Sequence, residues 1–216
     1  MPNDILERIV QAKQAEVAAA RREAPLARLR GEAEARRDLR PFHDALRAPG
    51  PSGVNVIAEI KRASPSKGVI CENLDPGRLA EAYTAGGARA ISVLTEGNFF
   101  RGSPEDLKQA RSSSRLPVLR KDFIFCDYQI YESAAMGADA VLLIARILHP
   151  PVIEDVRARP HARIGVEVAG RYEDPLAGRL VGLARAMPVA ALETAKILHV
   201  LGPQGIRACG SGIPAV

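Results

Sequence analysis

The sequence predicts an α/β fold with a parallel sheet, and a (β/α)8 TIM barrel is the architecture that we expect. Five short apolar segments typical of strands alternate with helical segments, at a repeat of roughly 25 residues. These strands are largely apolar, as strands buried on both faces must be. An open doubly wound sheet is the alternative, but no Gly-rich turn follows the first strand.

A helical extension is expected at residues 1–50, before a barrel of residues 51–216. Asn3 or Asp4 can cap the first helix, which carries a loose apolar stripe that includes Ile5. A turn cluster rich in Pro and Gly ends the extension. The expected helices cover residues 5–22, 25–35 and 42–46, and the turn covers residues 48–53.

Strands and helices should then alternate. The expected strands are 54–60, 89–94, 116–120, 140–144 and 164–168, with helices at 78–86, 104–112, 127–136 and 152–159. After about residue 168 the rhythm becomes irregular, and only residues 192–201 are typical of a further helix. The sequence ends at Val216, so we expect the eighth strand to be missing and the barrel to be incomplete, with the first and seventh strands as exposed edges unless a partner covers them.

The composition excludes several classes of protein. Of 216 residues, 47% are hydrophobic and 25% charged, with a net charge of +5. Acidic residues interleave with the densest basic region, residues 21–40, which indicates a solvated helical surface and no nucleic-acid site. The three cysteines have no metal-binding spacing, and neither a signal peptide nor a membrane span is found. We expect a cytoplasmic protein without a metal, and its oligomeric state is left open.

Charged residues stand at the ends of three predicted strands. Glu59 and Lys61 share one face of the first strand because side chains alternate along it. Lys121 ends the third strand and Glu167 lies in the fifth. In a barrel such strand ends carry the chemistry, where a lysine can act as a general acid and a carboxylate as a base. A structural ion pair is the alternative for any one such pair.

Four stretches resemble the indole-3-glycerol phosphate synthase family. They are Val56–Gly68, Ile91–Glu96, Pro117–Ile124 and Gly137–Ile144. The resemblance implies a TIM barrel with an N-terminal extension and a carboxy-lyase of tryptophan biosynthesis. It further implies a phosphorylated small-molecule substrate and no cofactor.

The resemblance also implies roles for individual residues. Lys121 would be the general acid, Glu167 the general base, and Glu59 would stabilise a cationic intermediate. Lys61 would bind substrate anions. Ser64, Phe123 and Leu142 would line the substrate pocket, and Ser211 and Gly212 would join Lys61 in binding phosphate.

The last third of the chain departs from the family's pattern. Ala169 stands where the family has histidine and Gly210 where it has glutamate, and residues 181–186 lack its two asparagines. These departures favour a second hypothesis, an inactive truncated or frameshifted remnant. A third is another phosphate-binding barrel such as phosphoribosylanthranilate isomerase, although the motifs around Lys61 and Lys121 fit the synthase specifically.

Overall fold

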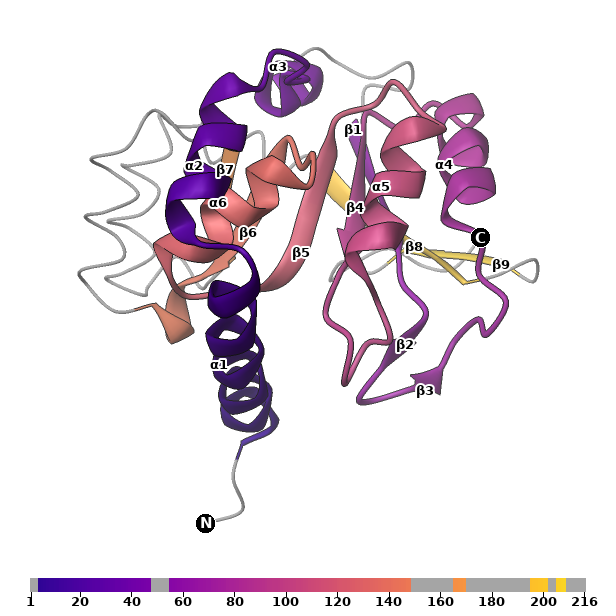
Figure 1. Ribbon diagram of the computed structural model, residues 1–216. Coiled ribbons are helices and arrows are strands. Elements are labelled where there is room, and N and C mark those ends of the chain that lie inside the picture. Colours follow the sequence, from indigo (N-terminus) through magenta and orange to yellow (C-terminus); the bar gives the residue numbers. More distant parts are fainter. Residues whose placement is uncertain (1–3, 48–54, 149–164, 170–194, 202–204, 209–216) are drawn as a thin grey trace.

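The computed structural model describes residues 4–47, 55–148, 165–169, 195–201 and 205–208 (Figure 1). Three helices precede the first strand: α1 (Ile5–Glu23), α2 (Leu26–Ala35) and α3 (Phe42–Arg47). Asp4 caps α1, as expected, because its side chain accepts a hydrogen bond from the Leu6 amide at 3.3 Å. The buried stripe of α1 is Ile9, Lys13 and Val17, so the assignment of Ile5 to this stripe was wrong.

The strands form one seven-stranded sheet in the order β7-β6-β5-β4-β1-β8-β9. All neighbouring strands are parallel except β8 and β9. The strands are β1 (Asn55–Ile60), β4 (Ala90–Leu94), β5 (Val118–Ile124), β6 (Ala140–Ile144), β7 (Gly165–Ala169), β8 (Ala195–Leu201) and β9 (Gly205–Ala208). The order of β1 and β4 to β7 confirms the expected run of adjacent parallel strands.

Helices separate the parallel strands, as the sequence predicts. They are α4 (Pro76–Ala85), α5 (Pro104–Ser112), α6 (Asp127–Ala135) and the short 3-10 helix η1 (Ala145–Ile147). Ser103 caps α5 by accepting a hydrogen bond from the Asp106 amide at 3.1 Å. A small antiparallel hairpin of β2 (Ala63–Ser64) and β3 (Gly68–Val69) follows β1 and was not predicted.

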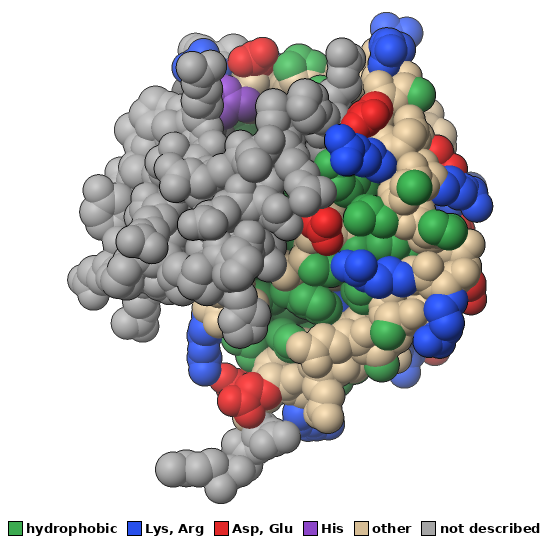
Figure 2. Space-filling model, turned by 60° about the vertical axis from the view of Figure 1, so that its left-hand side comes forward, with side chains coloured by type: hydrophobic (Ala, Val, Ile, Leu, Met, Phe, Trp, Pro, Cys, Tyr) green, Lys and Arg blue, Asp and Glu red, His purple; other side chains and the backbone are tan. Residues whose placement is uncertain are grey.

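Alternate residues of the strands pack on opposite sides of the sheet. Ile60, Ile91 and Val93 join the apolar cluster under α4 and α5. Ile57, Ala90, Leu119 and Ala140 form a second cluster on the other face, against α3. A third cluster joins α1, α2 and α6 to β5 and β6. Figure 2 shows a face on which hydrophobic side chains gather, with charged side chains among them and at the margins.

Two expectations about the C-terminal third are corrected. Residues 192–201 were expected to form a helix, but Ala195–Leu201 is the strand β8. A short apolar run fits a strand or a buried helix equally well, so the period alone could not decide between them. The expectation that β1 is an edge was also wrong, because β8 pairs with Asn55–Glu59 and satisfies that side of the strand.

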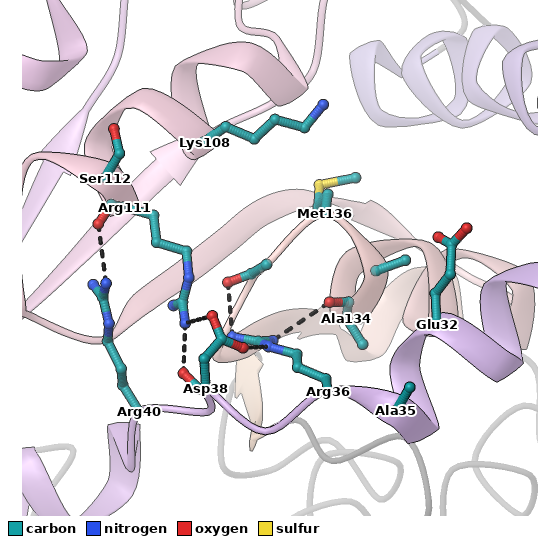
Figure 3. A pocket seen from close by; sticks show the side chains of 12 residues that line it. Glu32, Ala35, Arg36, Asp38, Arg40, Lys108, Arg111, Ser112, Ala134 and Met136 are labelled. Carbon is teal, nitrogen blue, oxygen red and sulfur yellow. Dashed lines mark hydrogen bonds and ion pairs between the residues drawn. The ribbon is translucent and has the colours of Figure 1, made fainter.

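An ion-pair cluster fastens the linker between α2 and α3 to the N-terminal ends of the strands (Figure 3). Arg36 Nη2 lies 2.7 Å from Oδ1 of the buried Asp139, and Arg111 pairs with its other oxygen. The Asp38 carboxylate accepts from Arg36 Nε at 2.8 Å and from Arg111 Nη2 at 2.9 Å. Both guanidinium groups hold the pKa of Asp38 well below its ordinary value. This cluster leaves the opposite end of the sheet open for a site.

Some expectations lie outside the described residues. They are the turn at 48–53, the helix at 152–159, residues 181–186 and the phosphate-binding candidates Ser211 and Gly212. The division into an extension of residues 1–50 and a barrel of 51–216 stays a prediction. Among the described helices, none is both long and apolar enough to cross a membrane.

Candidate active site

The centre of the candidate site is a carboxylate between two ammonium groups. The Glu59 side chain is completely buried at the end of β1. Its Oε1 lies 2.8 Å from Lys61 Nζ, and its Oε2 pairs with Lys121 Nζ. The lysine side chains are only 17% and 28% exposed. A buried carboxylate is tolerated where it is paired, and here each of its oxygens faces an ammonium group.

Strand geometry explains why these three residues meet. Ala58 and Ile60 belong to the cluster under α4 and α5, so Glu59 between them points to the other face of the sheet. On the neighbouring strands, Leu94 of β4 is in register with Lys121 of β5. All of these strands are parallel, so their C-terminal ends meet at one end of the sheet, where barrel enzymes carry their chemistry.

Backbone register also places Glu167 near this group. Leu142 of β6 is in register with Glu167 of β7. On the other side of β6, Val141 is in register with Arg120 of β5. Leu142 and Lys121 are the next residues on these two strands. The register of β5 and β6 shifts between Arg120 and Ile124, so Leu142 lies opposite the stretch of β5 that contains Lys121, and Glu167 lies beside Leu142 on the next strand.

Two aromatic rings form a wall at the end of the sheet that carries the lysines. The ring centroids of Phe123 and Phe100 are 6.0 Å apart, and the rings are tilted by 39°. Phe123 follows Lys121 on β5, and Phe100 belongs to the loop after β4. Leu142 is half-buried against the cluster that contains Leu119. Ser64, in the β2–β3 hairpin, is buried. The structure thus gives all three pocket candidates positions near the strand ends.

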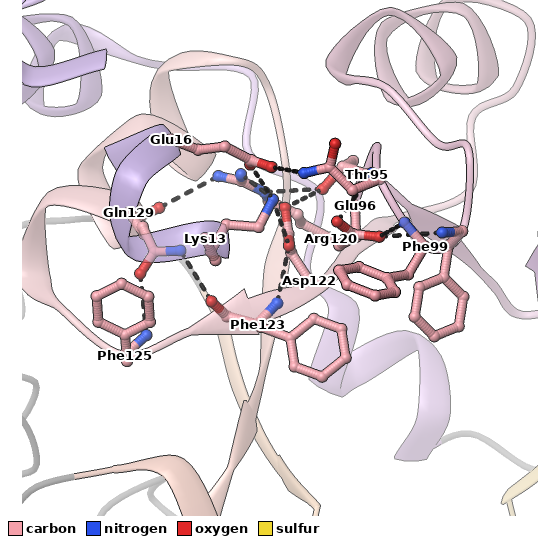
Figure 4. A network of polar contacts seen from close by, with 12 residues as sticks. Lys13, Glu16, Thr95, Glu96, Phe99, Arg120, Asp122, Phe123, Phe125 and Gln129 are labelled. Atoms are coloured by element: carbon pink, nitrogen blue, oxygen red, sulfur yellow. Dashed lines mark hydrogen bonds and ion pairs between the residues drawn. The ribbon is translucent and has the colours of Figure 1, made fainter. Parts of the chain in front are cut away.

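A buried polar network holds β5 on the side opposite Lys121 (Figure 4). The buried Asp122 accepts from Thr95 Oγ1 at 2.7 Å and pairs with Arg120 at 3.0 Å and Lys13 at 3.2 Å. Burial alone would raise the pKa of Asp122, but the positive charges of Arg120 and Lys13 outweigh it and hold that pKa below its ordinary value. Asp122 is therefore a structural partner, and it fixes the strand that carries Lys121.

Two residues of the site were not singled out from the sequence. Lys13 is 4% exposed and reaches Asp122 from α1. A signal existed, since Lys13 lies four residues from both Ile9 and Val17 on the buried stripe. Tyr83 of α4 donates a hydrogen bond to the Glu59 carbonyl at 3.0 Å. Burial, helped by the charge of Glu59, raises the pKa of Tyr83 to about 12.

The chemistry that the site offers rests on proton transfer and charge. In the described part of the chain, no three His, Cys, Asp or Glu side chains are grouped to hold a metal ion. The two ammonium groups can act as proton donors or anion ligands, beside a buried carboxylate and an aromatic wall. These groups suit the binding of an anionic aromatic molecule and acid–base chemistry on it.

Comparisons with known proteins agree with this chemistry. A family model described as indole-3-glycerol phosphate synthase matches residues 6–169. A protein of that name from Burkholderia ambifaria is 46% identical over 98% of this chain and 85% of its own length. Another, from Desulfosudis oleivorans, is 56% identical over 71% of this chain and 59% of its own length. The parallel sheet with its intervening helices fits the TIM-barrel fold of this family. The chain belongs to the indole-3-glycerol phosphate synthase family.

Proposed function

We propose that this chain is a carboxy-lyase that converts 1-(2-carboxyphenylamino)-1-deoxyribulose 5-phosphate to indole-3-glycerol phosphate, carbon dioxide and water. The observation that carries the proposal is the Glu59 carboxylate between Lys61 and Lys121 at the C-terminal ends of β1 and β5. Family membership supplies the identity of the substrate.

Lys121 is proposed as the general acid. The ring carbon that bears the carboxylate attacks the ketone carbon, and the Lys121 ammonium donates a proton to the ketone oxygen. The electrons of the carboxylate bond then return to the ring as carbon dioxide leaves. The new hydroxyl departs as water after a second proton donation. Lys121, reprotonated between the two donations, suits both steps because it lies beside the buried Glu59 at the C-terminal ends of the strands.

Glu167 and Glu59 are proposed to handle the positive charge of the reaction. Loss of water leaves a cationic intermediate that must give up a proton to become an indole. Glu167 removes this proton as the general base, and its backbone position beside Leu142 supports that role. Glu59 stabilises the developing positive charge on the ring nitrogen, since its carboxylate faces the same group of residues.

The remaining roles concern substrate binding. Lys61 is proposed to hold the anionic groups of the substrate, with Ser211 and Gly212 completing the phosphate site. Ser64 and Phe123 line the pocket, and Leu142 packs on the aromatic ring. The chemistry requires only proton transfer and charge stabilisation, so we propose that the enzyme needs neither a cofactor nor nucleic acid. We also propose that it is cytoplasmic.

The test is steady-state formation of the product, followed by its indole fluorescence. We expect turnover by the purified chain, and Lys121→Ala should lower kcat by about 10²–10⁴-fold with a smaller change in KM. Lys108→Ala, on an exposed surface of α5, is the matched control and should leave both constants unchanged. No turnover by the folded chain would contradict the proposed function and favour an inactive remnant of the family. Unchanged kcat in Lys121→Ala would remove Lys121 as the acid.

A further inference from the structure

Glu96 is a fully buried carboxylate that the proposed chemistry does not use. It follows Thr95 at the end of β4, and its relative exposure is 0%. No Lys or Arg of the described residues forms an ion pair with it. Its carboxylate accepts three backbone hydrogen bonds instead, from Asn98 at 3.0 Å, Phe99 at 2.7 Å and Phe100 at 3.0 Å (Figure 4). An ionised carboxylate is tolerated in such a place because several N–H donors replace its hydration.

The same residue closes the loop from its backbone side. The Glu96 carbonyl accepts a hydrogen bond from the Gly102 amide at 2.8 Å. Gly102 itself packs so closely on the end of β4 that a Cβ there would overlap the Leu94 carbonyl. Arg101, just before it, has a φ of 53°, which is unfavourable for a residue with a side chain. The loop of residues 97–102 is thus a tight, strained turn around the Glu96 carboxylate, and these hydrogen bonds offset the strain.

This turn carries one side of the aromatic wall. The Phe100 ring faces Phe123, a near neighbour of Lys121 on β5, at a centroid distance of 6.0 Å. The Phe100 carbonyl accepts from the Ala63 amide at 3.1 Å, which ties the turn to the hairpin that contains Ser64. A change in the turn would therefore reach the candidate site through the position of the Phe100 ring.

We propose that Glu96 is a positioning residue for the substrate's aromatic ring. It fixes the Phe100 ring through three backbone amides, so that Phe100 and Phe123 together form a preorganised wall. Its contribution is to substrate affinity, because the carboxylate itself contacts neither Lys61 nor Lys121 in the described structure. This inference rests on the proposed function of the site, but the conformation of the turn can be measured without activity.

The kinetic test compares Glu96→Ala, Phe100→Ala and the double variant. Each single change should raise KM by about tenfold and leave kcat within about threefold, since an ordered aromatic contact is worth on the order of one power of ten in affinity. If Glu96 acts through Phe100, the KM of the double variant should be no higher than the larger of the two single-variant KM values. Glu105→Ala, which removes an exposed carboxylate on α5, is the control and should change neither constant. Additive losses, or a large fall in kcat at unchanged KM, would overturn the inference.

Hydrogen exchange provides a readout independent of turnover. In Glu96→Ala, the amides of Phe99 and Phe100 should exchange at least about tenfold faster, because both donate to the same carboxylate oxygen, which this change removes. The amides in the centre of β4 should keep their protection, which shows that the fold is intact. Unchanged exchange at Phe99 and Phe100 would refute the role of Glu96 whatever the activity. A chain without turnover but with the expected exchange would refute the proposed function and leave the control of the turn by Glu96 standing.

Discussion

Lys13 Nζ lies 3.2 Å from Asp122 Oδ1, and both side chains are buried between α1 and the end of β5. Lys13 also binds Glu16 Oε2 at 2.5 Å, and Glu16 in turn accepts a hydrogen bond from the Asn98 side chain at 2.6 Å. One turn of the N-terminal helix therefore contacts both the strand that carries Lys121 and the loop that carries Phe100. The extension is part of the architecture that holds the candidate site.

Removing this buried cation should destabilise the fold. In Lys13→Met the side chain keeps most of its length, but Asp122 loses one of its two ion-pair partners in a buried place. We expect the free energy of unfolding to fall by about 3 kcal/mol. Lys108→Met removes an exposed pair with Glu105 and should change it by less than about 0.5 kcal/mol. Urea unfolding followed by circular dichroism measures the free energy of unfolding of both variants. Equal losses in the two variants would contradict a stabilising role for the buried Lys13.

Acid should weaken the same network. The pKa of Asp122 is lowered in the folded state, so its contribution to stability is full above the ordinary aspartate pKa of about 3.9 and is lost as the pH falls below it. Asp122→Asn should lower the stability at pH 6 but make it less sensitive to acid between pH 4 and pH 2. The measurement is urea unfolding across this range. Parallel pH profiles for the two proteins would exclude Asp122 as a source of the acid sensitivity.

Tyr83 should have the opposite pH dependence. Its pKa is raised to about 12 in the folded protein, so its contribution is full below the ordinary tyrosine pKa of about 10 and is lost as the pH rises through 12. Tyr83→Phe removes the hydrogen bond to Glu59 and should cost about 1 kcal/mol at pH 7. The difference from the unmodified protein should shrink at pH 11. A constant difference at the two pH values would argue against ionisation of Tyr83 on unfolding.

Two glycines should respond in opposite directions to alanine. Gly102→Ala forces a Cβ against the Leu94 carbonyl and should destabilise the protein by at least about 2 kcal/mol. Gly31 lies inside α2, and no atom lies within 4 Å of the place that an alanine Cβ would take there, so Gly31→Ala should stabilise by about 0.5–1 kcal/mol. Thermal unfolding of both variants distinguishes these outcomes. A Gly102→Ala protein as stable as the parent would show that the turn after β4 can relax.

Lys61 and Lys121 should differ in their kinetic signatures. Lys61→Ala removes a proposed ligand of substrate anions, so KM should rise by about tenfold or more, and by a larger factor than kcat falls. Lys61→Arg keeps the charge and should recover part of the affinity. Steady-state kinetics on these variants and on Lys121→Ala would separate the roles. The same loss of kcat for both lysines, at unchanged KM, would contradict the assignment of Lys61 to binding.

The strands of the first two thirds were predictable because each is a short apolar run with clear boundaries. The structure gives both the strand Ala140–Ile144 and the helix Pro104–Ser112 their predicted bounds. Strand β5 continues to Ile124, four residues beyond the prediction, because Lys121 and Phe123 point to one side while Asp122 and Ile124 are buried on the other. Charged residues within a strand look like its end when burial is unknown.

The site was predictable only in part. Glu59, Lys61 and Lys121 were identified because charge at a strand end has a direct meaning in a barrel. Lys13 and Glu96 were not identified. The role of Lys13 depends on Asp122, which is 109 positions away in the sequence, and the role of Glu96 depends on backbone amides. Backbone donors leave no mark in a sequence. The strand at Ala195–Leu201 was missed because pairing with β1 decides its conformation, and its local pattern does not.

The ion pair between Arg36 and Asp139 has a consequence for the order in which parts of the chain fold during synthesis. The two residues are 103 positions apart, so the first three helices leave the ribosome long before their binding surface exists. At 5–20 residues per second this interval is roughly 5–20 seconds. During that time the apolar stripe of α1 and the lysine within it have no partner, and the segment is exposed to proteases and chaperones. The helices α1 to α3, which are made before the strands on which they pack, are therefore among the last elements to become native.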